Sequence, residues 1–400
     1  MSRHIVGAGG DSLPTHPMIP DPVGLTRKLV SVPSVNPALQ EGGRGEGEVA
    51  KLIQDILTAH GFAVESRPVR DHRPNVFARL GVGGPTLLLN GHLDTVGVEG
   101  MTVDPWGGDS TADRIVGRGA ADMKSGIAVI IAVACAWARS PGPGTLVVAL
   151  TCDEEHASEG MQRLVESGIQ ADAAVVTEPT SLAVMPAHKG FAWVEVDFHG
   201  RAAHGSRPEV GVDAVRHAAG FVQELDSLEV SLEAEPRHAL LGHGSLHVGT
   251  IRGGTAWSVY PERCTVKLER RTLPHEAPEG FLDEVLRALD RVRGRDPSVR
   301  AEARLELVRP GSDVPSDTPL VRGLQQELRA VGLSDEPLGM TAWVDAAYLN
   351  GVGIPAVCFG PGSIAQALAA DEWVDTGEIR TAAAVLEAFT RRFLVGEVMP

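Results

Sequence analysis

The sequence is poor in aromatic residues, in positive charge and in long apolar runs, and each shortage excludes a class of function. Aromatic residues make up only 4% of the 400 residues, too few for a surface on which nucleic-acid bases stack. The 36 Lys and Arg residues are outnumbered by 52 Asp and Glu, and the resulting net charge of −16 repels phosphates. The same balance argues against an anionic membrane surface. We therefore expect neither nucleic acid nor a membrane as a partner.

Cysteine is also scarce. The sequence has four cysteines, none of them in a Cys-x-x-Cys pair, which indicates reduced thiols in a reducing compartment. No apolar core of a signal peptide is visible near the N-terminus, and residues 1–20 are expected to form a flexible leader. The most apolar stretch, 126–138, is shorter than the ~20 residues that cross a membrane, so we expect a buried helix there. These features predict a cytoplasmic protein.

Apolar runs without polar alternation recur along the chain and are typical of strands covered on both faces of a parallel sheet. Such runs predict strands at 75–80, 86–90, 145–151, 173–177 and 354–359. Helical periodicity lies between and beyond them, beginning at Leu25 and covering 47–60, 126–138, 159–167, 319–331 and 377–394. The sequence therefore predicts an α/β fold whose mixed, largely parallel sheet is flanked by helices.

A different pattern interrupts this alternation between residues 189 and 308. It predicts two strand–helix–strand halves: 191–199, 209–228 and 245–251, then 264–271, 278–293 and 299–308. The order β-α-β-β-α-β is that of a split, ferredoxin-like α+β unit. We therefore expect a discontinuous domain formed by 21–188 and 309–400, with a smaller domain, 189–308, inserted in it.

Candidate metal ligands follow three of the predicted buried strands. These residues are His92 and Asp94, then Glu154 and Glu155, and then Glu178. Ligands of open α/β sheets bind beyond the carboxyl ends of the strands, so these side chains are expected to converge. Asp122 joins them from a glycine-rich turn before the buried helix.

Each of these elements has an ordinary structural explanation when it is taken alone. A Glu-Glu pair after a strand is commonly a solvated loop, and an Asp before a helix is commonly an N-cap. These ordinary explanations do not predict that all of the candidate residues fall at the same edge of the sheet. One histidine with several carboxylates and no thiolate suits a divalent metal such as Zn²⁺, Mn²⁺ or Co²⁺.

Five motifs carry a resemblance to a known enzyme family. They are LLNGHLDTV at 88–96, GRGAADMKSG at 117–126, TCDEE at 151–155, VVTEPT at 175–180 and GRAAHGSRP at 200–208. In this order they resemble the family of di-metal hydrolases that includes aminoacylase, acetylornithine deacetylase, succinyl-diaminopimelate desuccinylase and carboxypeptidase G. The resemblance implies a zinc-peptidase-like α/β domain with an inserted dimerisation (lid) domain, and a homodimer formed through that insert. It also implies Zn²⁺ as the cofactor, one or two ions per chain, with Co²⁺ or Mn²⁺ as alternatives.

The resemblance also implies roles for the candidate residues. Asp122 is expected to bridge two metals, with His92 and Glu178 completing the first site. Glu155 belongs to the second site, and Glu154 is the general base that activates water and returns the proton to the leaving amine. Asp94 is the carboxylate that orients His92, a partner that ligating imidazoles also need on physical grounds.

Further roles fall in the insert. His204 is expected to reach the active site of the partner subunit and polarise the scissile carbonyl, with an ordinary surface histidine as the alternative. Arg271 matches an arginine that holds the substrate carboxylate, and an ordinary strand arginine remains the alternative. Ser258 stands where many relatives carry asparagine and is expected to contact the substrate. His188, near the junction with the insert, is equally compatible with a structural role.

Two departures from the family pattern lie in the C-terminal part. Val344 replaces the threonine that usually precedes the aspartate of Asp345-Ala346-Ala347. Leu368 stands where the family has a histidine that binds the second metal, and no histidine follows His275. If a second metal nevertheless binds tightly, Asp371 and Glu372 are the nearest replacements.

The resemblance predicts a metal-dependent amidohydrolase that cleaves the amide bond of a small N-acyl amino acid. A dipeptidase or glutamate-type carboxypeptidase acting on a short peptide is the first alternative. A non-hydrolytic homologue that binds a small amide is the second, because Leu368 cannot ligate a metal.

Overall fold

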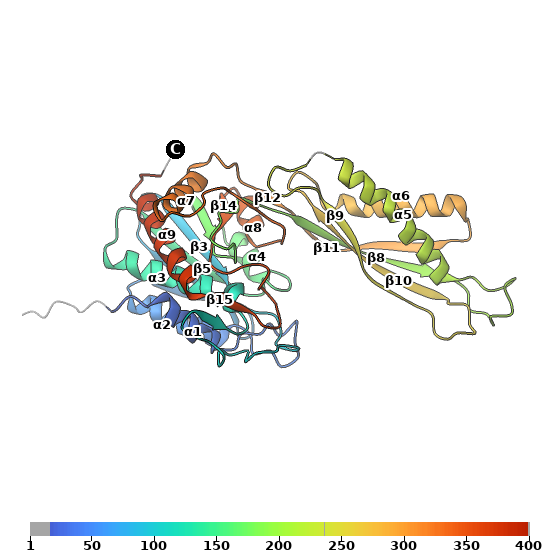
Figure 1. The fold of residues 1–400 in the computed structure, drawn as a ribbon, viewed down its shortest axis with the longest axis horizontal. Helices are drawn as coiled ribbons and strands as arrows, with labels where there is room; N and C mark the ends of the chain where they lie inside the picture. Colours follow the sequence, from blue (N-terminus) through green and yellow to red (C-terminus); the bar gives the residue numbers. More distant parts are fainter. Residues whose placement is uncertain (1–16, 236, 399–400) are drawn as a thin grey trace, which may run out of the picture.

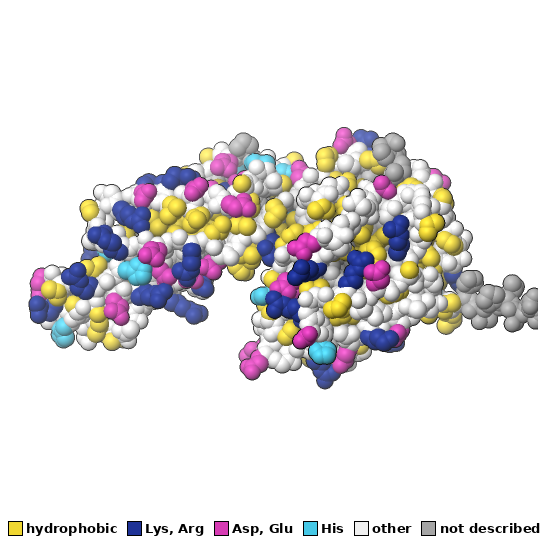
Figure 2. Space-filling model, turned by 180° about the vertical axis from the view of Figure 1, so that it is seen from behind, with side chains coloured by type: hydrophobic (Ala, Val, Ile, Leu, Met, Phe, Trp, Pro, Cys, Tyr) yellow, Lys and Arg dark blue, Asp and Glu magenta, His cyan; other side chains and the backbone are white. Residues whose placement is uncertain are grey.

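The chain folds into two lobes that lie side by side along the long axis of the molecule (Figure 1). The computed structural model describes residues 17–235 and 237–398, so most of the expected leader 1–20 lies outside the described residues. A space-filling view from behind shows the lobes separated by an open notch along one edge (Figure 2).

The first lobe contains a six-stranded sheet in the order β1-β2-β5-β3-β6-β14. Its strands are β1 (Ala63–Arg70), β2 (Arg73–Leu80), β3 (Thr86–His92), β5 (Thr145–Thr151), β6 (Ala173–Val176) and β14 (Ala356–Cys358). The strands β5, β3, β6 and β14 are parallel, whereas β2 is antiparallel to both β1 and β5. The predicted mixed, largely parallel sheet is confirmed. The edge strand β1 was not predicted because most of its side chains are exposed.

Helices cover both faces of this sheet. Their bounds are α1 (Pro22–Val30), α2 (Gly47–Ala59), α3 (Ser125–Arg139), α4 (Glu159–Glu166), α7 (Pro319–Ala330), α8 (Ala346–Gly351) and α9 (Thr376–Leu394). Along β3, Leu87 and Leu89 enter the core that contains α1, α2, α3, α7 and α9, while Leu88 enters the core that contains α4 and α8. Both faces are therefore apolar, which is why the strands lack polar alternation.

The apolar stretch around 126–138 forms α3, which packs against α1 and α9 inside the first core. One segment among the described residues, Ala120–Arg139, is long and apolar enough to cross a membrane, and its most apolar 18-residue window is entirely buried in the fold.

The second lobe contains an antiparallel four-stranded sheet in the order β11-β8-β10-β9. Its elements are β8 (Gly190–His199), α5 (Ala214–Ala234), β9 (Ser245–Gly253), β10 (Arg263–Thr272), α6 (Gly280–Arg295) and β11 (Arg300–Arg309). Both helices pack on one face, where they share a separate core with the strands. Helix α5 begins later than predicted because Asp213 caps it, accepting a hydrogen bond of 2.9 Å from the Arg216 amide.

Two small sheets tie distant segments together. One joins β7 (Ala187–His188), β12 (Ser312–Asp313) and β13 (Gly339–Met340) beside the two segments that connect the lobes. The other pairs β4 (Arg114–Val116) with β15 (Trp373–Asp375). The second pairing places the C-terminal loop next to the segment that carries Asp122.

Candidate metal centre

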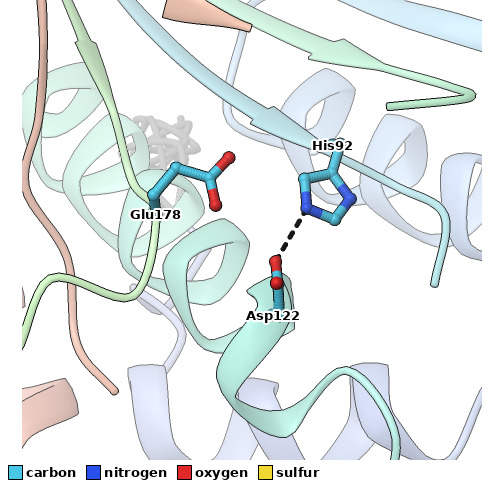
Figure 3. A group of neighbouring side chains, drawn as sticks. All are labelled: His92, Asp122 and Glu178. Carbon is cyan, nitrogen blue, oxygen red and sulfur yellow. Dashed lines mark hydrogen bonds and ion pairs between the residues drawn. The ribbon is translucent and has the colours of Figure 1, made fainter. Parts of the chain in front are cut away.

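Three buried side chains from separate elements meet at the carboxyl edge of the first sheet (Figure 3). His92 ends β3, Glu178 follows β6, and Asp122 lies in the turn η1 (Ala120–Lys124) before α3. Each offers one ligand atom, and these atoms all lie within 4.8 Å of one another. The convergence expected from the strand ends is therefore present in the structure.

Asp122 reaches this group because its backbone leaves the helical conformation. Its φ and ψ are −123° and 93°, although η1 is a π-helical turn. The extended backbone directs the carboxylate at His92, with Asp122 Oδ1 2.9 Å from His92 Nε2 (Figure 3). The ordinary explanation of an aspartate before a helix, an N-cap, does not describe this side chain.

The imidazole of His92 faces acceptors at both ring nitrogens. Nδ1 lies 3.0 Å from the backbone carbonyl oxygen of Asp94 and 3.6 Å from its carboxylate. Burial lowers the pKa of His92, but the hydrogen bonds to Asp122 and Asp94 outweigh it and raise the pKa well above its ordinary value. A metal bound at Nε2 would take the place of a proton on this nitrogen.

The carboxylate of Asp94 holds the loop that follows β5. It accepts hydrogen bonds from the amides of Glu154 (3.1 Å) and Glu155 (3.2 Å). The side-chain amide of Asn36 donates to the same carboxylate at 2.8 Å. Asp94 therefore orients His92 mainly through its backbone oxygen, while its side chain places the two glutamates.

Four acidic side chains of the site have raised pKa values. Burial is the main cause of the high pKa of Glu154, and the carboxylates of Glu178 and Asp345 add to it. Burial, together with the carboxylate of Asp122, raises the pKa of Glu155 well above its ordinary value and that of Glu178 to about 8. Burial also raises the pKa of Asp345 to about 7. Such a group of buried carboxylates lacks a compensating cation.

Two buried oxygen atoms show where a cation fits. Glu155 Oε1 and Glu178 Oε1 have no hydrogen-bond partner among the residues that the structure describes. Buried polar atoms are normally paired, so two orphaned carboxylate oxygens beside His92 and Asp122 point to a missing ligand. Imidazole and carboxylate donors suit a divalent metal, and the residues present fit one.

Comparison with known proteins agrees with this chemistry. Residues 88–392 match the Peptidase family M20/M25/M40. The chain belongs to this family. An acetylornithine deacetylase of Proteus mirabilis is 28% identical over 386 residues, which cover 95% of this chain and 98% of that protein. An acetylornithine deacetylase of Myxococcus xanthus is 30% identical over 358 residues, which cover 86% of this chain and 91% of the relative.

Solved structures share the fold of this M20 protein. Aminopeptidase PepT from Bacillus cereus superposes with a TM-score of 0.76 at 20% identity, covering 93% of this chain and 98% of its own. Human carnosine dipeptidase 1 superposes with a TM-score of 0.74 at 17% identity, covering 94% and 95% of the two chains. As a member of the M20 family, the chain is a metallohydrolase that acts on amide or peptide bonds, and the family implies a di-metal site.

The C-terminal loop of this M20 hydrolase supplies no evident ligand for a second metal. Leu368 has a positive φ of 61° and a side chain without donor atoms, 47% exposed. Asp371 is exposed, and the buried Glu372 carboxylate is already bound by Arg118 and by two backbone amides. The expectation that Asp371 or Glu372 replaces the histidine therefore finds no support in this arrangement.

The candidate residues of the insert lie at two opposite ends of its sheet, outside the group formed by His92, Asp122 and Glu178. His204 and Ser258 are neighbours, since the Gly205 amide donates to the Ser258 carbonyl at 2.7 Å and His204 bridges to Val259. Both are exposed, in loops at the end of the second lobe that lies away from the first (Figure 1).

Arg271 lies at the opposite end of the same sheet, paired with Phe191 at the start of β8. The length of β8 separates the two ends by about 30 Å. Glu269 accepts hydrogen bonds of 2.7 Å from both Arg271 and the indole of Trp193, which fixes the two side chains together.

Several residues that support the centre were not predicted from the sequence. Asn36 lies in a loop without periodicity, and nothing in the sequence links it to Asp94. Asp345 was noted only for its neighbour Val344, yet it is buried within the acidic group. His188 is buried in β7, and burial lowers its pKa to about 4, so its imidazole is neutral.

The raised pKa values predict how the metal-free protein responds to pH. Groups such as Glu178, with a pKa of about 8 in the fold against 4.5 ordinarily, bind more protons in the folded than in the unfolded state. Stability of the metal-free protein should therefore fall as pH rises from about 5 to 8, and metal binding should release roughly one proton or more. Thermal unfolding of the protein after metal removal by a chelator measures the stability across this pH range. Calorimetry of metal binding in two buffers measures the number of protons released. Glu178→Gln should flatten the pH dependence; stability of the metal-free protein that rises through this window would contradict the assignment.

The loop geometry predicts unequal metal binding. One equivalent should survive dialysis of the native protein, and a second should bind only at high metal concentration. Leu368→His should tighten the second site and raise turnover by orders of magnitude if two metals are needed. The loop should tolerate the change because histidine accepts a positive φ better than most residues do. Elemental analysis after dialysis checks the stoichiometry. A native protein that retains two tight metals and turns over rapidly would show that another residue completes the site.

Proposed function

We propose that the protein hydrolyses the amide bond of a small N-acyl amino acid, with Glu154 as the general base. The observation that carries the proposal is the buried group of His92, Asp122 and Glu178 beside two glutamates at the end of β5. The names of the curated relatives, acetylornithine deacetylases, support a deacylase. The names of structural neighbours support the alternative of a dipeptidase or carboxypeptidase acting on a short peptide.

Metal binding and proton transfer fall to different residues of the centre. His92, Asp122 and Glu178 would hold the first metal, with Asp122 and Glu155 directed toward a second. A bound divalent metal lowers the pKa of water toward about 7 and polarises a carbonyl. Glu154 is half-buried, and its amide donates to the Asp94 carboxylate, which holds Glu154 in the loop beside His92. There it takes a proton from the attacking water and returns it to the leaving amine.

The donor set favours Zn²⁺ as the metal, with Co²⁺ or Mn²⁺ as alternatives, because one imidazole is combined with carboxylates and no thiolate. The absence of a ligand at Leu368 favours one tightly bound ion. The same residue is the specific observation in favour of an inactive homologue, which turnover measurements distinguish from an enzyme.

We infer that the two lobes have separate tasks. Residues 21–188 and 309–400 form the catalytic domain, and residues 189–308 form a domain through which two chains associate. Because the sheet places His204 and Arg271 about 30 Å apart, one small substrate cannot contact both within a single chain. A two-fold dimer would bring His204 of one chain to the metal centre of the other. The composition of the chain supports a cytoplasmic location.

The roles of the two glutamates are separable by experiment. Glu154→Gln should reduce turnover of an N-acyl amino acid by about 10²–10⁴-fold while metal content stays near that of the parent. Glu178→Ala should lose metal as well as activity. Turnover should be measured on N-acetyl and N-succinyl amino acids and on dipeptides, beside elemental analysis. Equal metal loss in both variants would contradict the assignment, and no turnover of any amide by the metal-loaded parent would favour the inactive homologue.

Action of His204 across a dimer predicts complementation. His204→Ala and Glu154→Gln should each be nearly inactive alone, because each lacks one group of every active site. When the two are unfolded, mixed and refolded together, mixed dimers should contain one intact site and recover up to about a quarter of the parent activity, since half of the dimers are mixed. Light scattering verifies the dimer. A monomer at micromolar concentration, or a mixture as inactive as its components, would contradict the arrangement.

A further inference from the structure

The carboxylate of Glu372 binds the backbone of the segment that carries Asp122. Glu372 Oε1 accepts hydrogen bonds from the amides of Ala121 (2.9 Å) and Asp122 (3.0 Å). Its Oε2 accepts one from the Arg118 guanidinium at 2.6 Å. The Glu372 side chain is fully buried, so these protein donors take the place of water.

This contact gives hydrogen-bond acceptors to backbone amides that have no partner within the helix. The first amides of a helix have no partner within it, and here the irregular φ and ψ of Asp122 also interrupt the turn. A carboxylate near the start of a helix is favourable because those amides carry partial positive charge. Glu372, in the C-terminal loop, therefore accepts hydrogen bonds from these amides, a role that a capping residue next to the helix ordinarily has.

The loop is also held to the same segment by its main chain. β15 pairs with β4, and the Gly117 amide donates to the Glu372 carbonyl at 2.9 Å. Arg118 donates to the Ala369 carbonyl at 3.3 Å, one residue beyond Leu368. A shift of this loop therefore shifts the backbone on which the Asp122 carboxylate stands.

We propose that Glu372 is a positioning residue of the metal centre: it fixes the orientation of Asp122 through two backbone amides. By this route the C-terminal loop acts on the metal although it carries Leu368 and no ligand. The inference rests on the proposed metal role of Asp122, but it requires no particular substrate.

Metal affinity tests the proposal. The Zn²⁺ dissociation constant is measured by competition with a chelator, beside the absorption spectrum of the Co²⁺ form and the melting temperature of the metal-free protein. Glu372→Ala should weaken Zn²⁺ binding by about 10–100-fold, the range for partners that orient metal ligands, and should alter the Co²⁺ spectrum. Asp371→Asn, which removes an exposed carboxylate at the adjacent position, should leave both unchanged.

Two conservative variants keep the test informative if Glu372→Ala does not fold. Glu372→Gln retains an oxygen for the two amides but turns an NH₂ group toward Arg118, so its loss should be smaller than that of alanine. Adding Arg118→Met removes that conflict and should recover part of the affinity. If folded Glu372 variants bind Zn²⁺ as the parent does, or lose melting temperature without losing affinity, the proposal is wrong. Because no substrate is involved, a lack of amide turnover in the parent would leave this result interpretable on its own.

Discussion

The structure depends on the burial of negative charge at one edge of a parallel sheet. Six carboxylates, those of Asp94, Asp122, Glu154, Glu155, Glu178 and Asp345, gather around the single imidazole of His92. Removing a carboxylate from water without a partner costs several kcal/mol, so the members with raised pKa values are stable there only when protonated or bound to a cation. A divalent metal resolves this conflict, and the other features of the first lobe serve to hold the ligands near it.

The scaffold achieves this by making the ligands the last residues of rigid elements. Strands β3, β5 and β6 are buried on both faces and end at the same edge, so their following residues have little freedom. Asp94 and Asn36 fix the loop after β5, and Glu372 fixes the turn before α3. Sites built on strand ends with fixed supporting hydrogen bonds hold their geometry better than sites on free loops.

The sequence predicted the parts of this arrangement that depend on local pattern. The buried strands, the helix α3 and the β-α-β-β-α-β order of the insert follow from periodicity, and the strand ends identify His92, Glu154 and Glu178. Prediction failed where a contact between residues distant in the sequence determines the local structure. Strand β1 is mostly exposed, and β4 with β15 pairs segments more than 250 residues apart. Asn36 and Glu372 have no local signal, because their partners are distant in the sequence.

His92, Asp122 and Glu178 are expected to ligate a divalent metal, and the function of the centre depends on it. Anomalous diffraction at the zinc absorption edge, from crystals grown with Zn²⁺, tests it most directly. A peak is expected about 2.0–2.2 Å from His92 Nε2 and from oxygen atoms of Asp122 and Glu178. An ordered site with no anomalous peak, or a zinc ion bound only elsewhere on the chain, would contradict it.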